Sequence, residues 1–303
     1  MITFDEQVAI VTGAGHGLGR SHAMALAARG ARVVVNDLGG ARDGTGSSLS
    51  AASSVVAEIE AAGGEAMADG ADVTDVAAVD SMVDRAVERW GRVDILVNNA
   101  GILRDKSFAN MSRAEFDVVV DVHLKGTAIC TAAVWGHMRD QVYGRVVVTT
   151  SSTGLYGNFG QANYGAAKLG VVGLMNSLRA EGQKYDIRVN ALAPVAHTRM
   201  TDDLLPDEAK DLLKPREVTP GVLFLVSKDA PNGMILAAGA GGYAAVRIYE
   251  TQGIWLEEGQ RTPEAIASRL ADILDPADQQ EFTSGSEQTM KFLGKATHGQ
   301  EAT

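Results

Sequence analysis

Short runs of branched apolar residues alternate with longer Ala-rich segments along residues 1–245, and this alternation is the strongest constraint on the fold. An uninterrupted apolar run is typical of a strand buried on both faces of a sheet, and the segment after it has room for a crossover helix. We predict strands at Val8–Thr12, Arg32–Asn36, Glu65–Ala68, Ile95–Asn98, Arg145–Thr149, Arg188–Ala193 and Met234–Ala237. The sequence therefore predicts an α/β fold, with one doubly wound parallel sheet of about seven strands and helices on both faces.

Start and stop signals predict helices between these strands. Thr74 precedes a segment with apolar residues at helical spacing, and Gly91 follows it, so an N-cap, an amphipathic face and a glycine terminator occur in order. The pair Thr219-Pro220 predicts another helix start. Residues 39–54 are rich in Gly, Ser and Ala, and we expect a long mobile loop that runs into a helix.

The alternation of strand and helix stops after about residue 246. Thr262, Pro263 and Glu264 predict a capped helix that continues through apolar positions to Leu274, and we expect a polar tail after it. We therefore expect residues 1–245 to form the main domain. Residues 246–303 would form a C-terminal extension that packs on this domain or on a partner subunit.

Charge and composition exclude several classes of function. The chain carries 27 Lys and Arg against 38 Asp and Glu, a net charge of −11, without a dense basic cluster, so no nucleic-acid partner is expected. A hydrophobic content of 46% excludes a disordered chain. The longest nearly uncharged apolar stretches, 221–226 and 233–246, fall below the roughly 18 residues that a membrane helix needs. A single cysteine, Cys130, and acidic residues near the N-terminus predict a cytoplasmic protein.

A glycine-rich turn joins the first predicted strand to a helical pattern that begins at Arg20. The turn reads Thr12-Gly13-Ala14-Gly15-His16-Gly17-Leu18-Gly19. Its glycines at 13, 17 and 19 allow the backbone to turn tightly and to approach a pyrophosphate, whose charge would face the free N–H groups of the helix start. The alternative is an ordinary turn between a strand and a helix.

Asp37 ends the second predicted strand about 18 residues after Gly19. A carboxylate there can accept hydrogen bonds from ribose hydroxyls and would repel the additional phosphate of NADP, so we predict NAD as cofactor on a Rossmann-type sheet. Asp37 could instead cap a turn before Gly39. Asp72-Val73 and residues 98–101 follow two further strands at the carboxyl edge, where open α/β sheets bind ligands.

Tyr164 and Lys168 are four residues apart in a helical pattern, so their side chains share one face. A phenol with a reference pKa of about 10 is a weak base at neutral pH, and a neighbouring ammonium, aided by a positive nicotinamide ring, favours the phenolate. Ser151 ends the preceding strand. Its hydroxyl can bond a substrate oxygen while Tyr164 takes the alcohol proton and hydride moves to NAD. Ser152 or Thr153 could serve in its place.

Together these motifs resemble the classical short-chain dehydrogenases/reductases over about residues 3–245. The resemblance rests on Thr12-Gly13-x-x-x-Gly17-x-Gly19, Asp37, Asn98-Asn99-Ala100-Gly101, Ser151 and Tyr164-x-x-x-Lys168. Within that family the chain is most similar to the (3R)-hydroxyacyl-CoA dehydrogenase units of peroxisomal multifunctional enzymes, the group also called 17β-hydroxysteroid dehydrogenase type 4. This closer similarity rests on Val35–Gly40, the Gly/Ser insert after it, Gly101–Asp105, Val122–Gly126, Tyr156–Tyr164 and the C-terminal extension.

The resemblance implies a role for each site residue. Tyr164 would be the catalytic acid/base, Ser151 would stabilise the substrate oxygen, and Lys168 would bind the nicotinamide ribose and lower the pKa of Tyr164. Asn99 would line the cofactor pocket, and Asp72 with Val73 would hold the adenine. The implied NAD contacts are Gly13, Gly17, Leu18, Gly19, Asp37, Asp72, Val73, Asn99, Ala100, Gly101, Tyr164, Lys168, Pro194 and Thr198. No metal site is predicted.

Two positions depart from the family pattern. His123 stands where most members have an asparagine that anchors a water in a proton relay, and the multifunctional-enzyme group shares the histidine. Neutral histidine offers a donor and an acceptor, so His123 could relay protons as a fourth catalytic residue or be a buried structural residue. Val195 follows Pro194 where most relatives have glycine, so the implied cofactor contacts near Val195 and Thr198 lie next to a departure from the family pattern.

The sequence thus predicts an NAD-dependent oxidation of a secondary alcohol to a ketone, with a (3R)-3-hydroxyacyl-CoA as the expected substrate. The alternatives are a hydroxysteroid or cyclic-alcohol dehydrogenase of the same fold, and a non-catalytic nucleotide-binding sensor. Residues 197–215 predict an amphipathic lid over an apolar cleft, or else a surface helix. Arg104 and Lys106 are candidate CoA contacts. The resemblance also implies a homodimer or homotetramer packed through Ala128–Met138 and Tyr164–Leu178.

Overall fold

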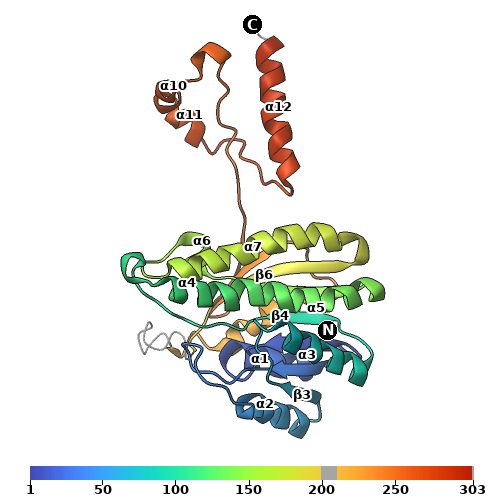
Figure 1. Ribbon diagram of the computed structural model, residues 1–303. Helices are drawn as coiled ribbons and strands as arrows, with labels where there is room; N and C mark the ends of the chain where they lie inside the picture. Colours follow the sequence, from blue (N-terminus) through green and yellow to red (C-terminus); the bar gives the residue numbers. More distant parts are fainter. Residues whose placement is uncertain (199–209, 302–303) are drawn as a thin grey trace. The chain divides into compact units, whose positions relative to one another are not determined.

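The computed structural model describes residues 1–198 and 210–301, with side chains up to residue 297. The chain divides into two compact units, Met1–Ala245 and Val246–Thr303. Both are drawn in Figure 1. Each unit is a separate body with its own internal contacts, so each is described by itself.

The first unit is built on a sheet of eight strands in the order β3-β2-β1-β4-β5-β6-β7-β8. The strands are β1 (Val8–Thr12), β2 (Arg32–Asn36), β3 (Glu65–Asp69), β4 (Ile95–Asn98), β5 (Gly144–Thr149), β6 (Ile187–Val195), β7 (Ile235–Gly239) and β8 (Gly242–Val246). The first seven pair in parallel; Val8 is in register with Arg32, and Ala9 with Ile95. The strand order reverses between β1 and β4, which is the place where open α/β sheets bind ligands.

This architecture confirms the predicted α/β fold with a doubly wound sheet, but the predicted number of strands is one too low. The additional strand, β8, follows β7 after only two residues, Ala240 and Gly241, whose φ angles are +49° and +76°. A two-residue turn with both φ angles positive joins antiparallel strands of a hairpin. The apolar stretch 233–246 therefore contains two strands and a turn.

Helices cover both faces of the sheet (Figure 1). The helices that pack together on one face are α1 (Gly17–Ala27), α2 (Ser50–Ala61) and α9 (Thr219–Leu225). Those on the other face are α3 (Val76–Trp90), α4 (Arg113–Val120), α5 (Gly126–Gln141) and α7 (Ala162–Gly182). The shorter elements are η1 (Phe108–Asn110), the π-helical turn η2 (Asp121–Lys125), α6 (Ser152–Tyr156), η3 (Gln183–Tyr185) and η4 (Pro215–Glu217).

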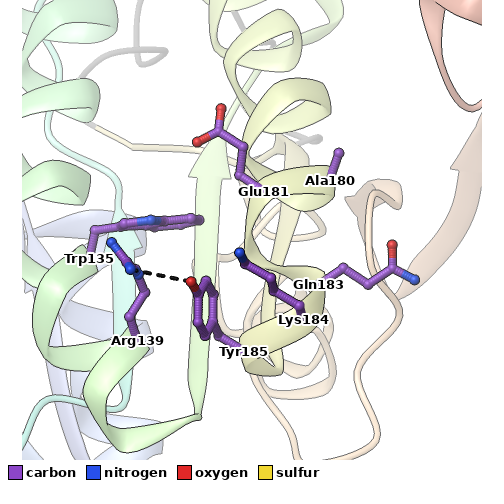
Figure 2. Close-up of a pocket in the computed structure, with 7 residues that line it drawn as sticks. All are labelled: Trp135, Arg139, Ala180, Glu181, Gln183, Lys184 and Tyr185. Atoms are coloured by element: carbon purple, nitrogen blue, oxygen red, sulfur yellow. Dashed lines mark hydrogen bonds between the residues drawn. The ribbon is translucent and has the colours of Figure 1, made fainter.

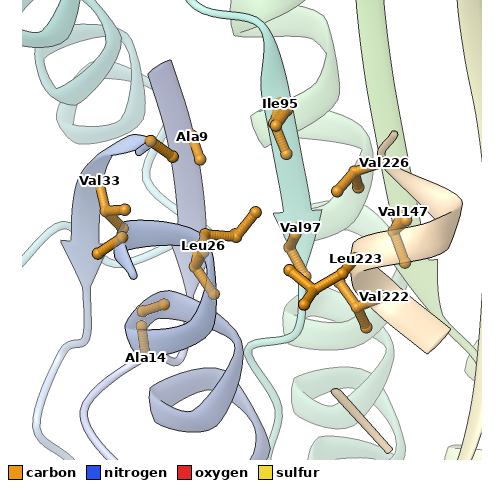
Figure 3. Packing of buried hydrophobic residues seen from close by; sticks show 14 of the residues in the cluster. Ala9, Ala14, Leu26, Val33, Ile95, Val97, Val147, Val222, Leu223 and Val226 are labelled. Atoms are coloured by element: carbon orange, nitrogen blue, oxygen red, sulfur yellow. The ribbon is translucent and has the colours of Figure 1, made fainter. Parts of the chain in front are cut away.

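The largest apolar cluster lies between the central strands and the face that carries α1 and α9. Figure 3 shows part of it, where Leu26 of α1 and Val222 of α9 meet Val97 of β4. All three side chains are completely buried. Because helices also cover the opposite face, the central strands β1 and β4 have runs of consecutive buried apolar residues instead of an alternating pattern. This rigid sheet fixes the strand ends that carry the candidate site.

The predicted helix signals are confirmed at most positions. Gly91, with φ +78°, ends α3 as expected, and α9 begins at Thr219 with Pro220 in its first turn. The predicted N-cap Thr74 is wrong by one residue. The carboxylate of Asp75 accepts the cap hydrogen bond, whereas the Thr74 hydroxyl and amide both donate to Asp72, at 2.8 and 2.9 Å.

One helical stretch of the first unit, Arg113–Gln141, is long and apolar enough to cross a membrane, with a mean hydropathy of 1.3 over its most apolar window. It comprises α4, η2 and α5, and it packs against α3 and α7 in the helix layer. Core helices of globular domains share this composition, so the feature is weak evidence for a span. The absence of a membrane span stays a prediction.

The second unit contains η5 (Glu258–Gln260), α10 (Pro263–Ser268), α11 (Leu270–Leu274) and α12 (Gly285–Glu301). Thr262 caps α10 as predicted, accepting a hydrogen bond from the Ala265 N–H at 3.1 Å. The single helix predicted here is broken at Arg269 into α10 and α11. The expected polar tail is mostly helix α12. Its Lys291 Nζ donates to Glu250 Oε1 at 2.7 Å, a contact between residues far apart in sequence.

The predicted lid, residues 197–215, lies largely outside the described residues, which resume at 210. At its described ends, the His197 N–H donates to the carbonyl oxygen of Leu213 at 2.6 Å. The two ends of the segment therefore lie side by side.

Candidate functional site

The glycine-rich turn between β1 and α1 has a backbone that requires glycine. Gly13 and Gly17 have φ angles of +63° and +53°. A Cβ atom on Gly13 would lie 2.8 Å from the Cα of Ala100, and one on Gly19 would lie 2.2 Å from the carbonyl oxygen of Gly13. The three predicted glycines thus allow close packing of the turn at the start of α1, where helix N–H groups can bind an anion.

Thr12 and Asn99 join the ends of β1 and β4 at the point where the strand order reverses. Thr12 Oγ1 accepts hydrogen bonds from the N–H groups of Asn99 and Ala100, at 3.0 and 3.1 Å. Asn99 Nδ2 donates to the carbonyl oxygens of Thr12 and Gly13, at 3.0 and 3.1 Å. No separate role was predicted for Thr12, although its place at a strand end next to the glycines could have indicated one.

A cavity of about 340 Å³ opens at this edge of the sheet. Ten predicted cofactor residues line it: Gly13, Gly17, Leu18, Asp37, Asp72, Val73, Asn99, Ala100, Gly101 and Thr198. Four others lie outside its lining as far as the described residues go. Gly19 packs against Gly13, Pro194 belongs to β6, and Tyr164 and Lys168 belong to α7. The structure thus brings most of the predicted cofactor residues together.

Asp37 lines the cavity and also organises the loops around it. Its Oδ2 accepts a hydrogen bond from the Gly15 N–H and its Oδ1 accepts one from the Gly39 N–H, both at 2.7 Å. Asp37 therefore both caps the turn before Gly39 and lines the cavity, so the two interpretations of this residue are compatible. Each carboxylate oxygen has a second lone pair, so the side chain can still accept hydrogen bonds from a ribose.

Ser151, Tyr164 and Lys168 meet at the start of α7. Ser151 caps α6 by accepting a hydrogen bond from the Thr153 N–H at 3.2 Å, and its hydroxyl is near enough to Tyr164 to lower the pKa of the phenol. Lys168 Nζ donates to the carbonyl oxygen of Thr149 at 2.6 Å and lies 5.5 Å from the centre of the Tyr164 ring. Spacing in the sequence correctly indicated that these three side chains would be neighbours.

The two alternative hydroxyls have other environments. Ser152 is exposed, and the buried Thr153 Oγ1 donates to Gln161 Oε1 at 2.9 Å. Of the three hydroxyls, that of Ser151 is the one that lowers the pKa of Tyr164, which favours Ser151 over Ser152 and Thr153.

Burial dominates the charge state of the catalytic candidates. It lowers the pKa of Lys168 from 10.5 to about 7. Burial also raises the pKa of Tyr164, while the hydrogen bond with Ser151 lowers it and the negative charge of Asp105 raises it further. The resemblance implied that Lys168 lowers the pKa of Tyr164. In the structure, burial is the largest effect on the pKa of Tyr164, and it raises that pKa.

His123 connects the cavity to the reaction centre. It lies in the π-helical turn η2, and its ring stands perpendicular to that of Tyr164 with the centroids 5.1 Å apart. Its Nε2 is 2.8 Å from the carbonyl oxygen of Ile102, a residue that lines the cavity. Its Nδ1 has no hydrogen-bond partner among the described residues. Burial and the charge of Lys168 hold the pKa of His123 well below 6.5, so its ring is neutral at pH 7.

A second hollow, of about 810 Å³, lies between the C-terminal ends of α5 and α7 (Figure 2). Arg139 there donates to Tyr185 Oη at 3.2 Å, and Lys184 and Arg139 together lower the pKa of Tyr185. Its lining contains none of the predicted site residues: Trp135, Arg139, Ala180, Glu181, Gln183, Lys184 and Tyr185. The cavity at the strand ends is therefore the candidate active site.

Comparison with known proteins shows the family of the chain. The model of the short chain dehydrogenase family matches residues 7–209. The chain is 44% identical over 281 residues to a peroxisomal hydratase-dehydrogenase-epimerase from Saccharomyces cerevisiae, which covers 92% of this chain and 31% of that protein.

Two solved structures are also similar. The full-length peroxisomal multifunctional enzyme type 2 from Drosophila melanogaster has a TM-score of 0.81 and 35% identity, covering 97% of this chain and 50% of that one. A short chain dehydrogenase from Mycobacterium avium has a TM-score of 0.77 and 42% identity, covering 90% and 96%. This chain thus spans half or less of the two peroxisomal relatives and almost all of the mycobacterial protein.

The close packing of the turn predicts the effect of substituting Gly19. Gly19→Ala would push a Cβ into the carbonyl oxygen of Gly13. We expect it to lower the free energy of unfolding by about 1–3 kcal/mol and to weaken binding of a nicotinamide cofactor. Denaturant unfolding and NADH fluorescence titration measure the two effects.

The matched control is Gly136→Ala on α5, where a Cβ meets nothing within 4 Å and helix propensity is expected to improve stability by about 0.8 kcal/mol. If Gly19→Ala behaves like this control in both measurements, the packing argument is wrong.

Proposed function

Because the chain belongs to the short-chain dehydrogenase family, we propose that it oxidises a secondary alcohol to a ketone with NAD as the hydride acceptor. Members of this family use a nicotinamide cofactor. The observation that carries the proposal is the contact of Ser151, Tyr164 and Lys168 beside a cavity lined by ten predicted cofactor residues. The residues fit such a cofactor, since Gly13 and Gly17 line the cavity without side chains and the carboxylate of Asp37 in the same lining offers acceptors.

The proposed substrate is a (3R)-3-hydroxyacyl-CoA. Support comes from the sequence resemblance to the dehydrogenase units of peroxisomal multifunctional enzymes and from the similarity to a relative named as a hydratase-dehydrogenase-epimerase. A hydroxysteroid or cyclic alcohol is the alternative substrate. The intact Ser151, Tyr164 and Lys168 argue against a non-catalytic sensor.

Each catalytic side chain has a distinct proposed task. Ser151 Oγ holds the substrate oxygen next to Tyr164, and the phenolate of Tyr164 accepts the alcohol proton. When bound, the oxidised nicotinamide supplies the hydride acceptor and a positive charge. Burial raises the pKa of Tyr164, so positive charge near the ring is needed to form the phenolate, and Lys168 contributes its share of that charge.

We propose that His123 supports proton transfer and is more than a structural residue. The support is its neutral ring, its edge-on contact with Tyr164, and its Nδ1, which is free of partners among the described residues and can act as a donor or an acceptor. The bond between Nε2 and Ile102 fixes the orientation of the ring.

The oligomer and the cellular location also remain proposals. We retain a homodimer or homotetramer packed through residues 128–138 and 164–178. The cytoplasmic location predicted from the single cysteine stays a prediction, and the relatives from yeast and fly are peroxisomal by name.

The experiment that tests the proposed function measures initial rates of NAD reduction by the purified protein. We expect fast turnover of (3R)-hydroxyacyl-CoAs and slow turnover of the (3S) isomers, 17β-hydroxysteroids and cyclic alcohols. Preference for a steroid or cyclic alcohol would contradict the CoA assignment and keep the reaction class. Tight NAD binding without turnover of any alcohol would contradict both.

Tyr164→Phe tests the catalytic base. Removal of the phenol oxygen should reduce kcat by about 10²- to 10⁴-fold, the usual contribution of general acid–base catalysis, and leave the Kd for NADH within about twofold. Tyr185→Phe is the matched control, because Tyr185 also lies beside cations but belongs to the hollow of Figure 2. A Tyr164→Phe protein that retains most of its activity would refute the assigned base.

Asp37→Asn tests the choice of cofactor. Removing the negative charge should lower the preference for NAD over NADP by about tenfold or more in kcat/KM, because the repulsion of the additional phosphate is lost. If only the hydrogen bonds to Gly15 and Gly39 mattered, their loss would weaken the binding of NAD and of NADP equally. If the ratio of kcat/KM with NAD to kcat/KM with NADP is unchanged, Asp37 stabilises the loops and does not select the cofactor.

A further inference from the structure

Gln161 is a buried amide at the N-cap of α7, three residues before Tyr164. Its Oε1 accepts hydrogen bonds from Thr153 Oγ1 at 2.9 Å and from Asn158 Nδ2 at 3.2 Å. Its Nε2 donates to Asp105 Oδ2 at 2.8 Å. One side chain therefore joins α6, the loop that follows it and the segment that contains Asp105.

That segment, Gly101–Lys106, which we call the strap, runs from the cofactor cavity to the start of α7. At the cavity end, Arg104 Nε donates to the carbonyl oxygen of Asp43 at 2.7 Å, and the Leu103 N–H donates to that of Arg42 at 3.1 Å. At the other end, the Lys106 N–H donates to the carbonyl oxygen of Gly160 at 2.9 Å. The strap is thus anchored on both sides of the reaction centre.

A second buried amide, Asn163, strengthens the attachment of the strap. Its Nδ2 donates to the carbonyl oxygens of Arg104 and Glu115, at 3.1 and 3.0 Å, and its Oδ1 accepts a hydrogen bond from the Tyr164 N–H at 2.8 Å. Gln161 and Asn163 therefore flank the position from which Tyr164 projects.

We propose that Gln161 is the positioning residue that sets Ser151 against Tyr164, and that Asp105 anchors Gln161 and adds a negative charge near the phenol. Ser151 is fixed by its cap bond to the Thr153 amide, and Thr153 is fixed by its hydroxyl bond to Gln161. The chain of bonds runs from the strap through Gln161 to α6, and it ends at Ser151. The inference rests on the proposed function, because it assigns how that site is assembled.

Three titratable side chains face Tyr164 from different elements: Asp105 from the strap, Lys168 from α7 and His123 from η2. His123 is neutral, and burial lowers the pKa of Lys168. The charge of Asp105 raises the pKa of Tyr164. Alcohol oxidation needs the phenolate, so removing this charge should move the rising limb of the kcat–pH profile to lower pH.

Substitutions at Gln161 and Asp105 separate positioning from charge. Gln161→Ala should lower kcat by about tenfold or more with the Kd for NADH unchanged, because a small displacement of reacting groups slows chemistry without weakening binding. Asp105→Asn keeps an acceptor for Gln161 and removes the charge, so the maximal kcat should be retained and the rising limb of the kcat–pH profile should move to lower pH. Gln183→Ala and Asp84→Asn, both at exposed positions, are the matched controls.

A rescue pair tests the bond itself. Gln161→Glu should impair kcat, because two carboxylates then face each other. Combining it with Asp105→Asn restores one hydrogen bond with donor and acceptor exchanged, since the new amide can donate to the new carboxylate. The kcat of the double variant should be at least about tenfold higher than that of Gln161→Glu. Equal activity of Gln161→Glu with and without Asp105→Asn would overturn the proposed bond.

A readout without substrate separates this inference from the proposed function. The protein has six tyrosines, so the NMR signal of ring-labelled Tyr164 can be assigned by its loss in Tyr164→Phe. Gln161→Ala and Gln161→Glu should shift this signal, and Gln183→Ala should leave it unchanged. Failure of every alcohol to react would refute the proposed function alone. Wild-type Tyr164 signals and wild-type kcat in both Gln161 variants would refute the positioning role.

Discussion

The hydrogen bonds between Thr12 and the Asn99–Ala100 backbone are the constraint on which the rest of the site depends. They hold the carboxyl ends of β1 and β4 together at the only place where the strand order reverses among the described strands. The crossover chains leave the sheet in opposite directions there, so a cleft forms without any strain in the sheet. The glycine turn, Asp37 and the strap all surround this junction, and each is fixed by bonds to backbone groups near it.

At the reaction centre, burial and hydrogen bonding have opposite effects on the pKa of Tyr164. Burial favours the neutral forms of Tyr164, Lys168 and His123 alike, whereas the Ser151 hydroxyl lowers the pKa of Tyr164 and so favours its phenolate. A site of this kind is poised to respond to a positive charge that arrives with a ligand. It would then remain a weak base in solution and become an effective one when the reactants are assembled.

Local chemistry explains what the sequence could predict. The glycines of the turn, Asp37 and the pair Tyr164–Lys168 follow from spacing within one turn or one helix, and the structure brings them together as expected. Long-range bonds explain what was missed. Asp105 and Gln161 are 56 residues apart, and the contact of Lys291 with Glu250 that supports α12 spans 41. Hydrophobic periodicity in the sequence does not predict contacts between residues so far apart. The raised pKa of Tyr164 was missed for a related reason, because burial is a property of the whole fold.

Two buried cations, Arg145 and Lys168, have different roles in this fold. Arg145 is completely buried, and it donates to the carbonyl oxygens of Gly144, Asp186, Ser227 and Lys228 and to the Asp186 carboxylate. A guanidinium so fully bonded can only stabilise the strand ends that it joins. Lys168 is also buried, but its Nζ makes one hydrogen bond among the described residues, to the carbonyl oxygen of Thr149. An ammonium has three donors, so Lys168 retains capacity to bond a ligand, and burial lowers its pKa. This imbalance of donors over acceptors, more than the Tyr-x-x-x-Lys spacing, is the physical argument that Lys168 belongs to the site.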